Sequence, residues 1–149
     1  MDADETRARA AILDTLSKYT RHVDSGRAVE LSQLFTFDTR YDMGGGVVAE
    51  GRDEIRGKVE ELKAVFAGAE SFGRIRHHTS SVFVEVESED RARAVSYFAA
   101  FSAQGPDHWG VYRDTLVRVG ERWLFASRTV VLEGAAPTSP VRGMLPTVP

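Results

Sequence analysis

The chain has 149 residues, a net charge of −3 and no cysteine, so it suits one domain with a single core and excludes disulfides, thiolate zinc sites, iron–sulfur clusters and cysteine nucleophiles. Basic residues are scattered and no apolar run approaches the ~20 residues of a membrane span, so neither nucleic acid nor a membrane is an expected partner. The amino terminus is acidic where a secretory signal would be basic and then apolar, which predicts a cytoplasmic protein.

Two helices are predicted at the start of the chain. Apolar residues recur at helical spacing over residues 8–23, behind Asp2 or Asp4 as the cap, so the first helix should end near Val23. A short second helix over residues 28–35 would complete a helical hairpin.

A glycine-rich turn and a third helix follow. Residues 36–43 are predicted to be extended, and residues 44–46, all glycine, to turn the chain into residues 47–50. A phosphate loop would also use three glycines, but no Lys-Ser or Lys-Thr pair follows them, so this interpretation is weak. The third helix is predicted from Gly51 to near Gly68.

The remaining pattern is that of strands in an antiparallel meander. Apolar and polar residues alternate, with turn residues between the runs, over residues 74–87, 92–103, 108–119 and 122–132. Helices on one face of a strongly curved antiparallel sheet are an α+β pattern, and they leave a cone-shaped cavity between sheet and helices. Residues 1–133 are thus predicted to form a single domain, and the proline-rich residues 134–149 an arm or lid.

The first of these strands distributes its side chains over two faces. Successive side chains of a strand point to opposite faces, so His77 and His78 cannot both face one pocket. The face of His77 also carries Thr79, Ser81 and Phe83, and it is predicted to line the cavity. The alternative is that both histidines lie at a wet strand end without a function.

The opposite face of the same strand is more apolar. It carries Val82, Val84 and Val86 next to alternate residues of the following strand, which is too apolar for a face in contact with water. We therefore expect a homodimer through the outer face of the sheet. Both faces of residues 92–103 are apolar, which predicts a central strand covered on both sides.

Several positions, taken in their order and spacing, carry a family resemblance. They are Tyr19 and Asp24 at the end of the first helix, Leu34-Phe35 followed by Asp38, Gly51 with Ile55, Arg76-His77-His78, the run Gly110-Val111-Tyr112-Arg113-Asp114-Thr115-Leu116, and Trp123 with Arg128. In these positions the chain resembles the SnoaL-like branch of the nuclear-transport-factor-two-like superfamily, which contains small polyketide cyclases, dehydratases and dehydrochlorinases. The resemblance covers residues 12–132 and implies the cystatin-like α+β barrel fold, whereas functions within the superfamily are mixed.

The resemblance also implies a catalytic pair. The hexachlorocyclohexane dehydrochlorinase, scytalone dehydratase and bile-acid dehydratase branches use an Asp at the end of the first helix with a His at the start of the third strand as an acid/base dyad, and Asp24 and His77 fill these positions. Tyr19 matches a Tyr that the bile-acid enzyme has five residues before the Asp. Ser81 stands where the family often has Asn, and residues 100–102 lack the second strand histidine of scytalone dehydratase.

The chemistry of this pair is proton transfer. A carboxylate that holds an imidazole in one tautomer raises its basicity, so His77 can take a proton from a carbon acid and return it to a leaving hydroxyl. Tyr19 can donate to the oxygen of the enolate that forms. From the residues alone, Asp24 in Asp-Ser-Gly also fits an ordinary turn residue, and Tyr19 a core tyrosine on the helix stripe.

Further residues are candidates for substrate binding. They are Tyr41, Ser81, Phe101, Trp109, Tyr112, Asp114 and Arg128. Asp114 and Arg128 lie on strands that should be neighbours, where a structural ion pair fits as well as a catalytic role. His22 and His108 are interpreted as surface groups. No metal or cofactor is expected, because the four histidines show neither a His-x-x-x-His spacing nor a thiol nearby.

The sequence therefore predicts a cofactor-independent lyase or isomerase, of the dehydratase or cyclase type, acting on a small apolar carbonyl compound of secondary metabolism. Asp24, His77 and Tyr19 would be its catalytic residues. The alternative is a non-catalytic ligand-binding or scaffolding dimer domain of the same fold. A dyad inside a closed cavity would favour the enzyme, whereas a cavity filled by Tyr97 or Phe101 would favour the scaffold.

Overall fold

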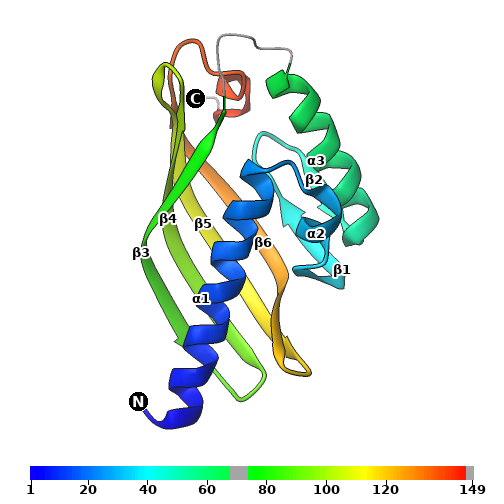
Figure 1. The fold of residues 1–149 in the computed structure, drawn as a ribbon, viewed down its shortest axis with the longest axis vertical. Helices are drawn as coiled ribbons and strands as arrows, with labels where there is room; N and C mark the ends of the chain where they lie inside the picture. The colour runs from blue at the N-terminus through cyan, green and yellow to red at the C-terminus, as the bar shows by residue number, and fades with distance from the viewer. Residues whose placement is uncertain (68–73, 147–149) are drawn as a thin grey trace.

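Residues 1–67 and 74–146 are described by the computed structural model, in which helices pack on one face of a strongly bent sheet (Figure 1). The helices are α1 (Ala3–Asp24), α2 (Ala28–Ser32) and α3 (Gly51–Ala67), with a 3-10 turn, η1 (Arg142–Met144), near the carboxy terminus. The strands are β1 (Phe35–Asp42), β2 (Val48–Glu50), β3 (Arg76–Val86), β4 (Arg91–Ser102), β5 (Gly105–Val119) and β6 (Arg122–Ala135). The predicted α+β class is confirmed.

The helices largely follow the sequence pattern. Asp2 caps α1 by accepting a hydrogen bond from the backbone N–H of Glu5 at 2.8 Å. α2 is shorter than predicted, because Phe35 is already the first residue of β1, where its buried ring stacks on Tyr41. α3 ends at Ala67, and the predicted end near Gly68 lies outside the described residues.

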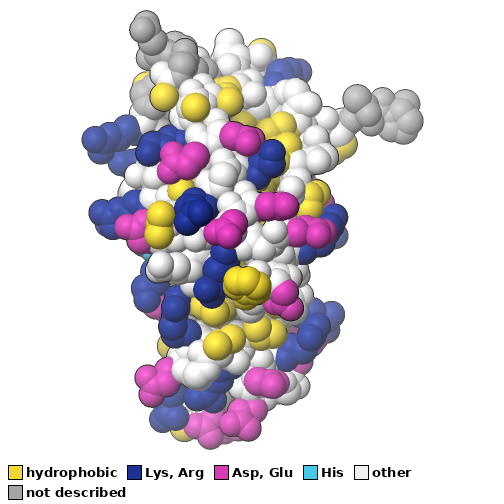
Figure 2. All heavy atoms as spheres, turned by 90° about the vertical axis from the view of Figure 1, so that its right-hand side faces the viewer, with side chains coloured by type: hydrophobic (Ala, Val, Ile, Leu, Met, Phe, Trp, Pro, Cys, Tyr) yellow, Lys and Arg dark blue, Asp and Glu magenta, His cyan; other side chains and the backbone are white. Residues whose placement is uncertain are grey.

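α3 presents a charged face to the solvent and an apolar face to the interior. Figure 2 shows basic and acidic side chains interspersed on the side of the molecule where α3 lies, without a large area of one sign. Ion pairs three residues apart, such as Arg56 with Asp53, contribute to this pattern. On the opposite stripe Ile55 is fully buried, and Leu62 packs against the core, so α3 is held by burial of one amphipathic face.

The sheet is mixed rather than purely antiparallel. β3 to β6 form the predicted antiparallel meander, but β1 pairs with β6 in parallel, and the strand order is β2-β1-β6-β5-β4-β3. No tight turn joins β1 to β6, so nothing forces this pair to be antiparallel. The two edges, β2 and β3, do not pair with each other, and the described sheet is therefore bent but not closed.

A β-bulge in β3 reverses the predicted faces in the second half of the strand. His77 faces the helices, but Ser81 and Val82 then stand opposite a single residue of β4, and Ser81 has a positive φ of 49°. The extra residue turns Phe83 outward, 65% exposed, and Val84 inward, 4% exposed. The predicted orientations of Phe83 and Val84 are therefore wrong.

The outer face of the sheet is still apolar, but of the three predicted valines only Val82 is exposed on it. Val84 and Val86 pack against the core. The exposed apolar side chains of β3, β4 and β5 are instead Val82, Phe83, Val95, Tyr97, Phe101 and Trp109, together with Val119 at the end of β5. Within the single chain β4 is thus covered on one side only, contrary to the prediction of a strand covered on both.

The carboxy-terminal segment folds back against the sheet at the upper end in Figure 1. After β6, the backbone N–H of Ala136 donates to the carbonyl of Asp107, and Val141 is buried. Met144 lies against Gly45 in the turn between β1 and β2, where a Cβ on Gly45 would come within 2.7 Å of the Met144 Cβ. The segment therefore spans from β5 to the β1–β2 turn, and residues 147–149 lie outside the described residues.

The reversed faces of β3 predict a contrast between two core-type substitutions. Leu16→Ala, which empties a buried position on α1, should lower the free energy of unfolding by about 2–5 kcal/mol. Phe83→Ala removes a larger but exposed side chain and should cost about 1 kcal/mol or less. Urea unfolding followed by circular dichroism measures both, and equal losses would contradict the assigned faces.

Candidate functional site

A cavity of about 380 Å³ lies between the helices and the inner face of the sheet. Its walls are mostly apolar and include side chains of α3, β6 and the carboxy-terminal segment: Val59, Leu62, Phe66, Leu132, Val141 and Met144. Polar side chains enter from α1, β1, β3 and β5: Tyr19, Asp24, Tyr41, His77, His108 and Tyr112. An apolar cavity of this size with a few convergent polar groups suits a small organic molecule.

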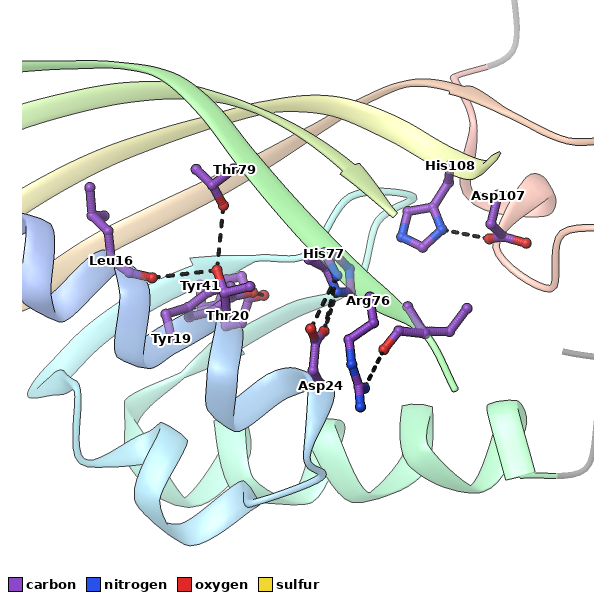
Figure 3. A network of polar contacts seen from close by, with 11 residues as sticks. Leu16, Tyr19, Thr20, Asp24, Tyr41, Arg76, His77, Thr79, Asp107 and His108 are labelled. Carbon is purple, nitrogen blue, oxygen red and sulfur yellow. Dashed lines mark hydrogen bonds and ion pairs between the residues drawn. The ribbon is translucent and has the colours of Figure 1, made fainter. Parts of the chain in front are cut away.

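Asp24 and His77 are in direct contact at one side of this cavity (Figure 3). The Nδ1 atom of His77 lies 2.7 Å from Oδ1 of Asp24, and the backbone N–H of His77 also donates to the same carboxylate, at 3.1 Å to Oδ2. A carboxylate can only accept, so Nδ1 carries the proton and Nε2 of the neutral ring keeps its lone pair. His77 is thus held as a base whose free nitrogen is available to the cavity.

The position of Asp24 explains why it needs these donors. It is the last residue of α1, where the helix dipole disfavours a negative charge. The side chain is only 10% exposed, so water compensates little of that charge, and the two N–H groups of His77 compensate for it instead.

His108 is a second histidine in the cavity, and its predicted surface position is wrong. It is 7% exposed, and its Nδ1 lies 2.6 Å from Oδ2 of Asp107. A bulge in β5 makes this pair of neighbours possible: Ala100 pairs with His108 and Phe101 with Pro106, so Asp107 is the extra residue. Bulges of this kind re-aim side chains near functional sites.

The two histidines come together because they share one row of the sheet. His77 pairs with Ala100 of β4, and Ala100 pairs with His108 of β5. The small side chain of Ala100 between them leaves room for the two imidazole rings to approach each other, and their ring centres are 5.4 Å apart. Burial lowers the pKa of His108, although the hydrogen bond that its Nδ1 donates to Asp107 works in the opposite direction.

A cluster of tyrosines forms another wall. The hydroxyl groups of Tyr19 and Tyr41 are hydrogen-bonded to each other. Burial raises the pKa of both phenols, and that of Tyr112, so all three stay protonated and able to donate. Because one hydroxyl of the pair donates to the other, one proton of the pair remains for an oxygen of a bound molecule.

Asp114 and Arg128 form a buried, bidentate ion pair behind these tyrosines. Both N–O distances are 2.7 Å, and the guanidinium carbon of Arg128 lies 3.9 Å from the ring centre of Tyr19 and 4.2 Å from that of Tyr112. Burial opposes the charge on each partner; it raises the pKa of Asp114, whereas for Arg128 the nearby carboxylate prevails and its pKa is also raised. Neither side chain lines the cavity, so their role is to support the tyrosine wall.

Besides Asp114 and Arg128, three more of the predicted substrate-binding residues do not line the cavity. Ser81 is exposed in the β3 bulge, and Phe101 points outward with His78 against its edge. Trp109 covers Gly134 on the outer face, where a Cβ on that glycine would lie 2.3 Å from the indole. The bulge in β3, which sequence alternation does not show, places Ser81 outside, whereas Phe101 and Trp109 point outward by the ordinary alternation of β4 and β5.

Among the described residues, no three histidine, aspartate or glutamate side chains come together as a metal site would require. Likewise, no helix in the part of the chain that the structure describes is long and apolar enough to cross a membrane. His22, the remaining histidine, is half-buried near the end of α1 and does not line the cavity.

The buried, neutral state of His108 predicts a pH dependence of stability. Above the ordinary histidine pKa of 6.5, both folded and unfolded chains keep this ring neutral, and stability is fully present. As the pH falls from there through the lowered pKa of His108, the unfolded chain takes up the proton first and stability is lost. Urea unfolding between about pH 7.5 and about pH 5 should show a steeper decline for the wild type than for His108→Phe, and parallel curves would contradict the assignment.

The chain is similar to known proteins over nearly its whole length. Solved structures of the same fold include a candidate scytalone dehydratase from Novosphingobium aromaticivorans, with a TM-score of 0.82 and 24% identity over 99% of this chain and 97% of that one. LinA has a TM-score of 0.76 and 18% identity, covering 98% of this chain and 97% of that one. ActVI-ORFA from Streptomyces coelicolor has a TM-score of 0.73 and 20% identity, covering 85% of this chain and 98% of that one.

At these identities the likeness of structures shows the fold and not the activity. No curated protein matches the sequence. The model of the SnoaL-like domain, however, matches residues 4–129, which is most of the chain. The protein therefore belongs to the SnoaL-like domain family, with the fold described as cystatin-like or nuclear-transport-factor-two-like in its structural neighbours.

Proposed function

We propose that the protein is a cofactor-independent lyase or isomerase, of the dehydratase or cyclase type, that moves a proton on a small apolar carbonyl compound. The observation that carries this proposal is the 2.7 Å contact between Nδ1 of His77 and Asp24, on a ring that faces an apolar cavity. A base oriented by a carboxylate in a water-poor site is the arrangement that proton abstraction from carbon requires.

The reaction begins at Nε2 of His77. This nitrogen removes the acidic proton next to the carbonyl, and the C–H electron pair becomes the enolate. Asp24 stabilises the imidazolium that forms, because its charge lies 2.7 Å from the ring. In a dehydration, the leaving oxygen then takes the bonding pair and the proton from His77, departs as water, and leaves the ring neutral again.

The tyrosine wall supplies the partner for the enolate oxygen. Tyr19 and Tyr41 both line the cavity and share one hydrogen bond, so their second proton is free to donate. Neutral buried phenols stabilise an oxyanion without a competing solvent shell. We assign this donor to Tyr19, with Tyr41 as its hydrogen-bond partner.

The rival function, a scaffold without catalysis, is less well supported. A filled cavity would favour it, but Tyr97 and Phe101 are 56% and 39% exposed and absent from the cavity wall. A similar structure is named as a candidate scytalone dehydratase, which supports elimination chemistry. Within the predicted arm of residues 134–149, the described part would act as a lid, since its residues Val141 and Met144 contribute to the wall.

The exposed apolar residues of the outer sheet face are, in our proposal, the contact with a second copy of the chain. Of the predicted valines only Val82 stays in this contact, together with Phe83, Val95, Tyr97, Phe101 and Trp109.

The dyad predicts a large and non-additive loss of base catalysis. A suitable probe is a nitro-substituted benzisoxazole, whose ring opens to a coloured phenolate when its C–H proton is removed. His77→Ala and Asp24→Asn should each slow this opening by about 10²–10⁴-fold. The double variant should be no slower than the worse single one, because both changes disable one unit.

A matched control is His78→Ala, which removes the neighbouring histidine from the exposed face of β3. It should open the probe at the wild-type rate. A double dyad variant within a few-fold of wild type, with circular dichroism showing a folded chain, would remove the proposed function.

If the outer face forms a dimer, a single substitution in this face should change the mass of the assembly in solution. Tyr97→Glu places a charge in the middle of the exposed apolar face and should convert a wild-type dimer to monomer in sedimentation velocity experiments at micromolar concentration. Phe37→Glu, at a residue 83% exposed on β1, is the control and should leave the mass unchanged. A monomeric wild type would contradict the dimer.

A further inference from the structure

His108 faces the cavity beside the dyad, yet the reaction described above does not use it. We propose that His108 is a hydrogen-bond acceptor that selects substrates carrying a hydroxyl group at the bond that breaks. The inference rests on the proposed function and narrows it to hydroxy carbonyl compounds, in preference to halides or ethers.

The first step is the tautomer of His108, which Asp107 fixes. Its Nδ1 lies 2.6 Å from Oδ2 of Asp107, and the same oxygen accepts a hydrogen bond from Oγ of Ser139 at 2.7 Å. Because the carboxylate only accepts, Nδ1 carries the proton and Nε2 keeps its lone pair. Figure 3 shows this second nitrogen turned away from Asp107.

The second step is what Nε2 lacks. Among the described residues no hydrogen bond reaches this nitrogen, and it is not one of the buried atoms that lack a partner, so it is open to the cavity that His108 lines. A molecule that fills the cavity excludes water from this acceptor, so its binding is favoured if it brings an O–H group to the same position.

The third step is the distance to the base. The ring centres of His77 and His108 are 5.4 Å apart, over the small side chain of Ala100. A hydroxyl group has one proton to donate and two lone pairs. Bound between the rings, it can donate to Nε2 of His108 while it accepts the proton that His77 has taken from carbon.

The reaction proceeds without His108 gaining or losing a proton. His77 takes the proton next to the carbonyl, the C–H pair forms the enolate, and the C–O bond breaks with its pair on oxygen. The proton on His77 then moves to that oxygen, so that water leaves and both rings are neutral. A halide or an ether oxygen has no proton for His108, and its binding would leave the acceptor unpaired.

The test compares two probes that give the same ultraviolet-absorbing enone. One is the aldol adduct of acetone and benzaldehyde, which loses water, and the other is its methyl ether, which loses methanol. The readout is the ratio of kcat/KM for the two, corrected for the uncatalysed rates. His108→Phe keeps a ring of similar size but removes the acceptor, and it should lower this ratio by about 10- to 100-fold.

Two further variants separate recognition from structure. His108→Gln offers an amide oxygen as acceptor and should recover part of the ratio, whereas His78→Phe, on the exposed face of β3, should keep the wild-type ratio. Partial unfolding of His108→Phe lowers both rates by the same factor and does not change their ratio. A ratio equal to that of the wild type therefore counts against the proposal.

The outcomes distinguish this inference from the proposed function. If the wild type treats the alcohol and the ether alike, whether it converts both or neither, the role of His108 is overturned. If the nitro-substituted benzisoxazole still opens in a manner that depends on His77, the proposed function survives that result. If its opening does not depend on His77, the proposed function itself fails.

Discussion

The carboxylate of Asp24 ties the end of α1 to the start of β3, and the cavity depends on that contact. One turn earlier on α1, Thr20 meets Thr79 of the same strand at 3.4 Å. Four helical residues rise about 6 Å and two strand residues about 6.6 Å, so the two contacts fit the same pair of elements without distortion. The bonds that hold α1 against the sheet edge are also those that fix the tautomer of His77. Folding and base orientation thus share one interaction.

Two of the sheet's β-bulges, those in β3 and β5, then decide which side chains of these strands reach the interior. Without the extra residue in β5, Asp107 and His108 would point to opposite faces of the sheet, and neither could orient the other. The bulge in β3 lies farther along the strand and returns Val84 to the core after the polar stretch beside the cavity. The bulge in β5 therefore forms the polar pair of Asp107 and His108 at the cavity, and the bulge in β3 restores apolar packing farther along the strand.

Helices and most strands could be predicted because their periodicity is local. The stripe of Ile12, Leu16 and Tyr19 and the alternation of β4 are visible in short windows of sequence. Asp24 and His77 were predicted as a pair from a family resemblance. Their contact could not be predicted from local patterns, because the two residues are far apart in the sequence and only the fold brings them together. What alternation could not show were the bulges, which depend on pairing between strands. Hence the predictions that Ser81 and Phe83 face the cavity and that His108 lies at the surface were wrong. For His108 the sequence did offer a signal, because Asp107 directly precedes it at the start of a strand, where a bulge can pair the two side chains.

The buried pair of Asp114 and Arg128 is better explained by the tyrosines than by stability. Removing two charges from water is costly, and a pair of this kind adds little over apolar side chains of similar volume. Its guanidinium carbon, however, lies 3.9, 4.2 and 4.4 Å from the ring centres of Tyr19, Tyr112 and Phe125, and this contact fixes the positions of the phenols. Burial raises the pKa of Tyr19, and the positive charge of Arg128 lowers it in part, whereas Arg128 is only a minor influence on Tyr41. Of the two bonded phenols, Tyr19 is therefore the one whose donor strength Arg128 helps to maintain.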